Sequence, residues 1–186
     1  MDTRTELLKC AENVARRRGY DGFSYADLAK EVGIRKASIH YHFPAKADLA
    51  VAMIERYASS FSDALAVIDE TSDIASDRLE AYVQSYRKAL SGGAKLCLCV
   101  AFSVSRDSLS KEALQELDDF HSMSHEWLMN TFQLAKKDNS VSNVGDPKDE
   151  AAALLAMVEG AQLVARAACK VADYDRATRL FLKRLA

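Results

Sequence analysis

The sequence contains little proline and little glycine, with two and seven such residues among 186. Proline and glycine are the residues that interrupt helices most strongly, so their scarcity allows long helices to run unbroken. Alanine, leucine, glutamate, lysine and arginine are abundant and favour helix. A hydrophobic content of 49% is sufficient for a core and argues against disorder. We therefore expect an all-α fold.

The sequence also lacks the segments that would take it to a membrane or an oxidising compartment. No stretch approaches the roughly 18 charge-free apolar residues of a membrane span, and the opening MDTRTELLKC has no apolar signal core. The four cysteines, at positions 10, 97, 99 and 169, form no repeated CxxC pair. We expect a cytoplasmic protein with free thiols and no membrane partner.

Net charge is nearly balanced but unevenly distributed along the chain. The formal net charge is −2. Residues 1–50 contain nine Lys or Arg and seven Asp or Glu, whereas the remainder contains sixteen and twenty. The amino-terminal end is therefore the more basic one, which permits a surface that contacts phosphate without requiring it.

Two short helices joined at a glycine are predicted near the amino terminus. Ser24 and Asp27 have capping-box spacing, so a helix should begin there and run to Gly33. A further short helix should run from about residue 35 to 43 and end at the proline that follows. Two such helices around a glycine are typical of a helix-turn-helix, and a helix expected from residue 3 to about 18 completes a three-helix unit.

The rest of the chain also has the periodicity of helices. A long helix should begin at Lys46 and reach about residue 69, and the polar segment DETSDIASD should follow it. After this segment we expect a helix that ends near residue 90, and two more that cover 95–105 and 110–137. Asp146 and Pro147 should start the next helix, which covers 150–173, and a last helix should begin near residue 175. The total is about nine helices.

The predicted helix 150–173 is apolar on two sides. Its polar residues, among them Glu159, Gln162 and Arg166, form one narrow strip, and most of the remaining residues are apolar or small. One side can pack within its own domain, and the other suits contact with a second copy. The alternative is an ordinary buried core helix. We expect a four-helix dimer interface that includes Leu154, Val158, Ala161, Ala165, Ala168, Leu180 and Phe181.

The segment FSYADLAKEVGIRKASIHYHFPAKADL, residues 23–49, resembles the DNA-binding signature of TetR-family bacterial repressors. The resemblance implies a helix-turn-helix DNA-binding domain over 1–46, followed by a larger helical domain over 47–186 for effector binding and dimerisation. It implies a repressor that binds a palindromic operator as a homodimer and leaves it when a small molecule binds. Two positions depart from the family pattern, because His40 stands where tyrosine is frequent and Ala37 where glycine or proline is frequent.

The resemblance places ten residues at the DNA. The second helix of a helix-turn-helix lies in the major groove, where its first residues meet base edges. Other side chains of the motif are placed for phosphate oxygens, with the His40 imidazole in place of a phenol. A solvated helix start is the alternative for the Arg-Lys pair. The base-reading candidates are Arg35, Lys36, Ala37 and Ser38, and the phosphate candidates are Ser24, Tyr25, His40, Tyr41, His42 and Lys46.

The effector pocket is likewise implied by the resemblance, in which the middle helices enclose a small molecule. Aromatic and flexible side chains there suit an apolar or aromatic ligand, although each is individually typical of plain core. The candidates are Tyr82, Tyr86, Cys97, Phe102, Met123, Trp127 and Phe132. The effector's identity, the operator and the regulated genes do not follow from the sequence.

Four alternatives depend on other residues. Cys97 or Cys99, expected on one apolar helix, could sense oxidants or electrophiles in a repressor of the same fold. His121 and His125 have the spacing of two metal ligands but lack an evident third, so we expect no metal or cofactor. A small helical enzyme could use His121, His125, Glu126 and Asp118, but no nucleophile or phosphate motif supports it, and we expect no enzyme. A protein-binding relative that has lost DNA affinity is the fourth.

Overall fold

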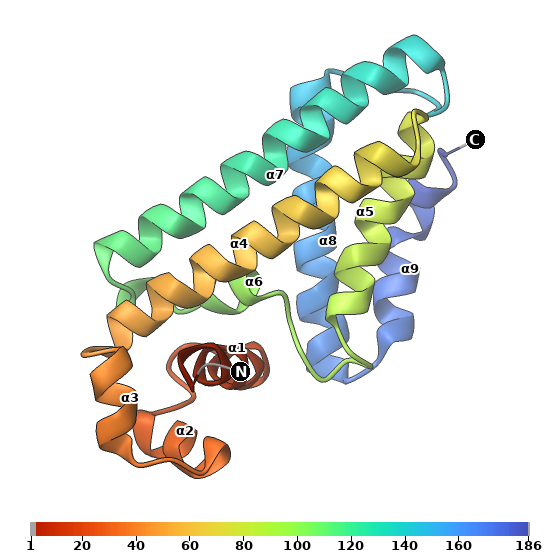
Figure 1. The fold of residues 1–186 in the computed structure, drawn as a ribbon. Coiled ribbons are helices and arrows are strands. Elements are labelled where there is room, and N and C mark those ends of the chain that lie inside the picture. The colour runs from red at the N-terminus through yellow and green to blue at the C-terminus, as the bar shows by residue number, and fades with distance from the viewer. Residues whose placement is uncertain (1–2, 186) are drawn as a thin grey trace. The chain divides into compact units, whose positions relative to one another are not determined.

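The computed structural model describes residues 3–185 and confirms the all-α fold (Figure 1). These residues form nine α-helices and one 3-10 turn, with no strand beyond an isolated bridge between Val141 and Leu185. The helices are α1 (Thr3–Arg18), α2 (Tyr25–Val32), α3 (Lys36–His42), α4 (Lys46–Thr71), α5 (Ala75–Ala89), α6 (Leu98–Ser103), α7 (Lys111–Asp138), α8 (Pro147–Ala168) and α9 (Val171–Leu182).

The described chain divides into two compact units. The first contains the residues up to Ser59 together with Leu98–Phe120, and the second contains Ser60–Cys97 together with the residues from His121 onward. Helices α4 and α7 each contribute one part to each unit. In the first unit α1 packs on α2 and α6, and α2 packs on α3; in the second, α5, α8 and α9 pack on one another. The functional division into 1–46 and 47–186 stays a prediction.

Local sequence signals place the helix-turn-helix as expected. Ser24 caps α2, because its side chain accepts from the Asp27 amide and its own amide donates to the Asp27 carboxylate, which completes the capping box. Gly33 ends α2 with a φ of 76°, in the left-handed region that glycine enters without a steric penalty. A tight turn follows, and α3 begins at once.

The predicted helix 150–173 was wrong at its carboxy-terminal end. Helix α8 starts as expected, with Asp146 accepting from the Lys148 amide and Pro147 at the first helical position. It ends at Ala168, and Cys169 adopts a left-handed φ of 53° before α9 begins at Val171. Gln162 does not belong to an exposed polar strip either, because its side chain is fully buried.

Helix α6 spans six residues and not 95–105, so Cys97 lies before it in a non-helical segment and does not share a helix with Cys99.

Helix α8 is, among the described helices, one whose length and composition would also fit a membrane span. Core helices of globular proteins pass the same test, and α8 buries six of its residues against its own unit.

Candidate nucleic-acid interface

The first turn of α3 is exposed, and Ile39 and Phe43 anchor the helix in the first unit. Arg35, Lys36 and Ala37 are exposed and Ser38 is half-buried. Ile39 has no exposed surface and Phe43, the residue that ends α3, is 2% exposed. Arg35 precedes the helix in an extended conformation and makes no capping hydrogen bond with its side chain. The predicted base-reading residues are therefore free to meet another molecule while α3 stays packed.

Tyr25 does not have the expected place. Its side chain is 6% exposed, and its hydroxyl donates to the carbonyl oxygens of Phe43 at 3.0 Å and Ala45 at 2.6 Å. Burial raises the pKa of Tyr25 to about 12, with smaller contributions from Asp48 and Tyr20, so the hydroxyl keeps its proton at neutral pH. Tyr25 ties α2 to the turn between α3 and α4, and its predicted phosphate contact is withdrawn.

Lys46 also has internal partners where a phosphate contact was expected. Its ammonium nitrogen donates to the carbonyl oxygens of Tyr20 and Phe23. The cation thus satisfies the backbone of the turn between α1 and α2. Sequence position alone gave no sign of these contacts, because the partners lie more than twenty residues earlier in the chain.

His40 is exposed on α3 and is oriented by the backbone that follows it. Its Nδ1 lies 3.1 Å from the carbonyl oxygen of Pro44. Because a carbonyl can only accept, Nδ1 carries the proton in this contact and Nε2 is the second ring nitrogen left to meet solvent. The imidazole also packs edge-on against the Tyr25 ring at 4.9 Å between centroids. Its contact with phosphate stays a prediction.

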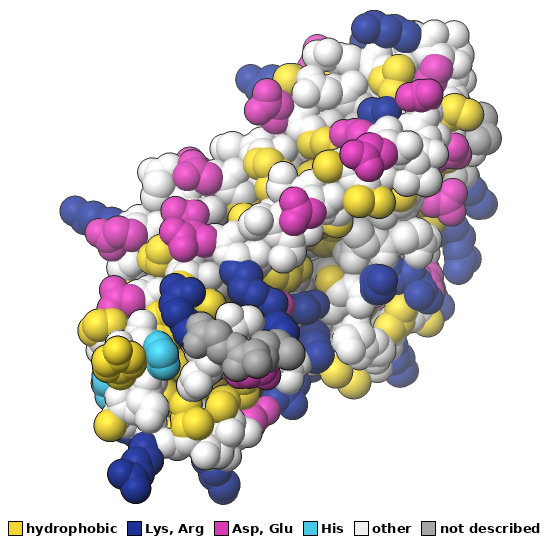
Figure 2. Space-filling view, viewed as in Figure 1, with side chains coloured by type: hydrophobic (Ala, Val, Ile, Leu, Met, Phe, Trp, Pro, Cys, Tyr) yellow, Lys and Arg dark blue, Asp and Glu magenta, His cyan; other side chains and the backbone are white. Residues whose placement is uncertain are grey.

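The remaining phosphate candidates lie at the same end of the helix-turn-helix. Ser24 is exposed, and its hydroxyl donates to the Asp27 carboxylate at 2.6 Å while it caps α2. Tyr41 is 84% exposed, an unusual position for so large an aromatic side chain in a monomer. His42 is half-buried and packs edge-on against Tyr41. Figure 2 shows Lys and Arg side chains at the tip formed by α2 and α3, and acidic side chains over α4 and α7.

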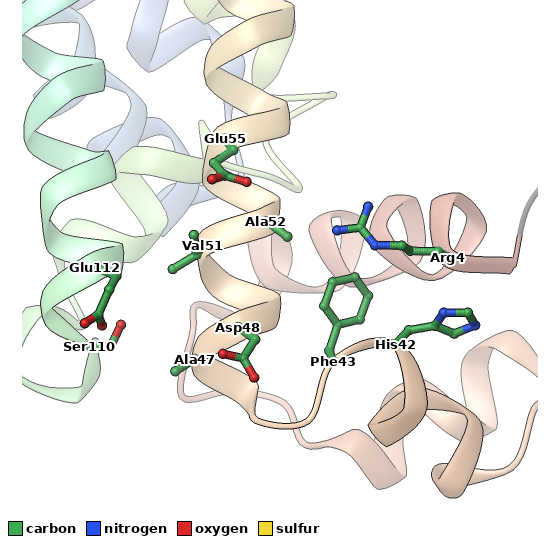
Figure 3. A pocket seen from close by; sticks show the side chains of 10 residues that line it. All are labelled: Arg4, His42, Phe43, Ala47, Asp48, Val51, Ala52, Glu55, Ser110 and Glu112. Atoms are coloured by element: carbon green, nitrogen blue, oxygen red, sulfur yellow. The ribbon is translucent and has the colours of Figure 1, made fainter.

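A pocket of about 380 Å³ lies in the first unit, beside α3 and the base of α4 (Figure 3). Phe43, Val51 and Ala52 form apolar wall, and the guanidinium of Arg4 lies 5.0 Å from the centre of the Phe43 ring. Charged side chains at its edge are those of Asp48, Glu55 and Glu112. Arg4 and His42, the latter a predicted phosphate contact, also line the pocket, and none of the predicted effector residues does.

The predicted effector residues do not form one group. Tyr82 stacks on Trp127, with 5.5 Å between ring centroids and 16° between planes, and packs against Tyr86 at 5.2 Å. The Tyr82 hydroxyl lies 2.7 Å from the Ser124 hydroxyl, and burial is the main cause that raises the pKa of Tyr82. Cys97 is buried, and its amide donates to Gln162, whose own amide donates to the Tyr86 carbonyl oxygen.

Two of the other predicted effector residues pack against different rings. Phe102 is buried in the first unit against Tyr20, and Phe132 is buried against Phe181 of α9. Met123 is half-buried on α7. The effector pocket stays a prediction, best supported by Tyr82, Tyr86 and Trp127.

The predicted dimer residues mostly face their own subunit. Leu154, Val158, Ala161, Ala165 and Phe181 are each less than 8% exposed, so they form intramolecular core and their assignment to the interface is corrected. Ala168 and Leu180 are exposed, the latter by 77%. The other exposed apolar residues of α8 are Ala152, Ala153, Ala156, Leu163, Val164 and Ala167. A pocket of about 240 Å³ beside Met157 and Leu180 lies on the same surface of α8 and α9.

The histidines of α7 have separate partners. Nε2 of His121 lies 3.2 Å from the Glu159 carboxylate, and Nε2 of His125 lies 3.2 Å from the Lys148 carbonyl oxygen. Within residues 3–185 no group of three or more His, Cys, Asp or Glu side chains is arranged to hold a metal ion. Glu126 is exposed, as is Asp118.

The sequence is similar to known regulators of transcription. Residues 7–53 match the family described as bacterial regulatory proteins, tetR family. The HTH-type transcriptional repressor NemR of Escherichia coli K12 is 26% identical over 168 residues, which cover 89% of this chain and 84% of NemR. The HTH-type transcriptional regulator CymR of Pseudomonas putida is 36% identical over 55 residues, which cover 30% of this chain and 27% of CymR.

Solved structures agree over the whole chain. A transcriptional regulator of the TetR family from Agrobacterium tumefaciens has a TM-score of 0.92 and 28% identity, covering 98% of this chain and 97% of its own. Escherichia coli NemR in its reduced form has a TM-score of 0.86 and 25% identity, covering 100% of this chain and 98% of its own. The similarity therefore extends beyond the helix-turn-helix to the helices that follow it.

Proposed function

The chain belongs to the TetR family of bacterial transcriptional regulators, and on that premise we propose that it is a cytoplasmic repressor that binds a palindromic operator as a homodimer. Helices α2 and α3 make the DNA contact. A small molecule that binds in the second unit releases the protein from DNA. The relatives named above are regulators and not enzymes, which favours this function over the acid-base chemistry of α7.

One observation carries the proposal: the exposure of Arg35, Lys36 and Ala37 on a helix whose next turn is buried through Ile39. A helix held in this way can enter the major groove with its first turn while its other face stays packed. Arg35 can donate two hydrogen bonds to a guanine, and Lys36 and Ser38 can contact neighbouring base edges. The phosphate contacts that we propose are those of Ser24, His40, Tyr41 and His42.

The dimer that we propose uses the exposed apolar side of α8 and α9. Val164 is 58% exposed, Leu163 40% and Leu180 77%, and alanines occupy the intervening surface of α8. Small side chains allow two helices to approach closely, and contiguous exposed apolar surface of this kind is typical of an interface. Two helix-turn-helix motifs on one dimer would meet two half-sites, which gives specificity that one motif cannot reach.

The effector is proposed to be an apolar or aromatic molecule bound beside Tyr82, Tyr86 and Trp127. Stacked rings offer apolar contact, while Ser124 and the two phenols supply hydrogen bonds. Trp127 is the only tryptophan of the chain, and its indole donates to the Asp69 carboxylate at 2.9 Å. A ligand that enters here changes the surroundings of this single fluorophore, so quenching or a spectral shift on ligand addition would identify effectors.

A thiol-responsive repressor of the same fold is the second candidate function. Cys97 is adjacent to this cluster through its bond to Gln162, and the NemR structure is described as a reduced form. Alkylation of the protein under native conditions, with mass spectrometry of Cys97 and Cys99, tests it. If alkylation abolishes operator affinity, thiol control is supported. If the cysteines are modified and operator affinity is unchanged, thiol control is ruled out.

Binding to the DNA upstream of the protein's own coding sequence tests the main proposal. A labelled upstream fragment should form a complex that an excess of unrelated DNA of equal length does not displace, and whose affinity falls steeply with salt. Equal affinity for both fragments would contradict the proposal.

Arg35→Ala is the matched variant for this assay. Because Arg35 caps nothing with its side chain, the substitution should leave the fold intact, weaken binding by about 1 to 3 kcal/mol and relax one operator position. Lys88→Ala, which changes an exposed cation on α5 in the second unit, serves as the control for charge alone.

A further inference from the structure

The ammonium group of Lys46 lies against the turn that joins α1 to α2. Its nitrogen lies 2.6 Å from the carbonyl oxygen of Tyr20 and 2.7 Å from that of Phe23. The same nitrogen lies 4.4 Å from the centroid of each of these two rings. A cation is thus held by two backbone acceptors and two aromatic faces, all within the first unit.

The two rings against this nitrogen are themselves fixed. Tyr20 and Phe23 are 6% and 4% exposed, and their rings pack edge to face with 6.5 Å between centroids. Tyr20 also packs edge-on against Phe102 of α6 at 5.4 Å. Burial lowers the pKa of Lys46, whereas the carboxylates of Asp21 and Asp27 oppose that change. The hydrogen bonds to the two carbonyl oxygens compensate this half-buried cation for the water that it loses.

A second set of hydrogen bonds holds the same end of α4. The Tyr25 hydroxyl of α2 donates to the carbonyl oxygens of Phe43 and Ala45, which lie immediately before Lys46. Lys46, at the start of α4, holds the turn that precedes α2, and Tyr25 holds the first turn of α2 against the end of α3. The two contacts together determine how α2 and α3 are oriented on the first turn of α4.

We propose that Lys46 is a positioning residue for DNA recognition: it fixes the helix-turn-helix on the start of α4 and makes no contact with DNA itself. The inference rests on the proposed function, because orientation matters only if α3 reads DNA. A phosphate contact would have to use the one remaining N–H of the ammonium, or would require Lys46 to leave carbonyl oxygens that then lose their donor.

Chemical footprinting of the wild-type protein tests this without any substitution. The full-length protein, free and bound to its upstream DNA fragment, is treated with N-hydroxysuccinimidyl acetate, and acetylation of each lysine is quantified by mass spectrometry. Lys46 should react slowly in both states, because its nitrogen is hydrogen-bonded to two carbonyl oxygens and lies against two rings. Lys36, which is exposed, should react quickly in the free protein and slowly in the complex. If Lys46 is acetylated as quickly as Lys36 in the free protein and is protected only when DNA is bound, the inference is overturned.

Salt dependence of the Lys46→Gln variant gives an independent reading. Each phosphate that a cation neutralises contributes about 0.9 to the slope of log affinity against log salt. Lys46→Gln should weaken operator binding by about tenfold or more with the slope unchanged, because orientation is lost and no phosphate contact is removed. A slope that is smaller by about 0.9, or an unchanged affinity, would contradict the positioning role.

The two levels of the proposal fail in different ways. If the wild-type protein forms no specific complex with its upstream DNA, the proposed function is wrong. If the complex forms and protects a reactive Lys46, only the positioning role is wrong. Should Lys46→Gln lose the helical circular dichroism signal of the native protein, the wild-type footprint decides alone.

Discussion

The hydroxyl oxygen of Tyr25 lies 2.6 Å from the carbonyl oxygen of Ala45, so the first turn of α2 is bonded to the residue that precedes α4. Together with the bond to the Phe43 carbonyl, this contact closes the helix-turn-helix on itself. The proposed base-reading residues Arg35 and Lys36 take no part in these two hydrogen bonds. The side chains that hold the helix-turn-helix together are therefore not the ones proposed to read DNA.

Tyr25→Phe should separate these two roles. Removal of the hydroxyl leaves two carbonyl oxygens without this donor, which should lower the free energy of unfolding by about 1 to 3 kcal/mol. Denaturant unfolding at fixed protein concentration measures the effect. Tyr41→Phe is the control, because Tyr41 is 84% exposed and its loss of a hydroxyl should leave stability unchanged. Equal stability of Tyr25→Phe and the wild type would show that the bond contributes nothing.

Gly93→Ala should destabilise the second unit more than Gly92→Ala. Both glycines have positive φ, 89° and 74°, so an alanine at either position carries backbone strain of roughly 1 kcal/mol. A Cβ at Gly93 would also lie 3.0 Å from the Cys169 carbonyl carbon, whereas a Cβ at Gly92 would meet nothing within 4 Å. Thermal unfolding of the two variants compares them directly. The expectation fails if Gly92→Ala is the less stable protein.

The ion pair of Glu150 and Arg184 should make stability depend on pH. Arg184 donates to Glu150 at 2.7 Å and 3.0 Å, and this bond is the first cause that holds the pKa of Glu150 below its ordinary value, against an opposing effect of burial. A lowered folded pKa contributes stability that is present above the unfolded pKa and is lost as pH falls through the folded one.

At pH 7 Glu150→Gln should therefore be less stable than the wild type by about 1 to 3 kcal/mol. The difference should shrink as pH falls below about 4, where the unfolded glutamate takes up its proton. Urea unfolding across this pH range measures it. A difference that stays constant down to the acid limit would mean that the charge of Glu150 is irrelevant.

Val164→Asp should dissociate the proposed dimer. The substitution places an unpaired carboxylate on the apolar side of α8, where a second copy would bury it. Sedimentation velocity should show a monomer for this variant and a dimer for the wild type. Val67→Asp is the matched control, because Val67 on α4 is also 58% exposed and lies outside the proposed interface. A dimeric Val164→Asp protein would place the interface elsewhere.

Local signals made much of the fold predictable from the sequence. The capping box of Ser24 and Asp27, the turn at Gly33 and the start at Asp146 and Pro147 depend on residues within three positions of one another. Such signals fix helix ends whatever the rest of the chain does. The exposed start of α3 has no side-chain cap of its own and was expected from the helix-turn-helix pattern and the family resemblance.

Other features depended on residues distant in sequence. Lys46 and Tyr25 look like surface residues of a helix start, and only the fold brings carbonyl oxygens from other turns to them. The break at Cys169 carries no glycine or proline, and apolar periodicity continues through it, so a single helix was expected. Gly93, whose missing side chain leaves room for the Cys169 backbone, lies far earlier in the chain.

The dimer face shows the limit of periodicity. A helix that is apolar on two sides does not reveal which side its own subunit covers. Leu154, Val158 and Ala165 were assigned to the partner, but they are the side that α8 buries in its own unit. Only the fold identifies Leu163 and Val164 as solvent-facing.

Hydroxyl-radical footprinting of the upstream DNA with the wild-type protein tests the central claim most directly. We predict two protected patches related by a two-fold axis, with centres about 10 base pairs or a multiple of that apart, and with loss of both patches in the Arg35→Ala variant at protein concentrations that saturate the wild-type complex. Protection without two-fold symmetry, or protection that Arg35→Ala leaves unchanged, would contradict a dimer that reads DNA through the first turn of α3.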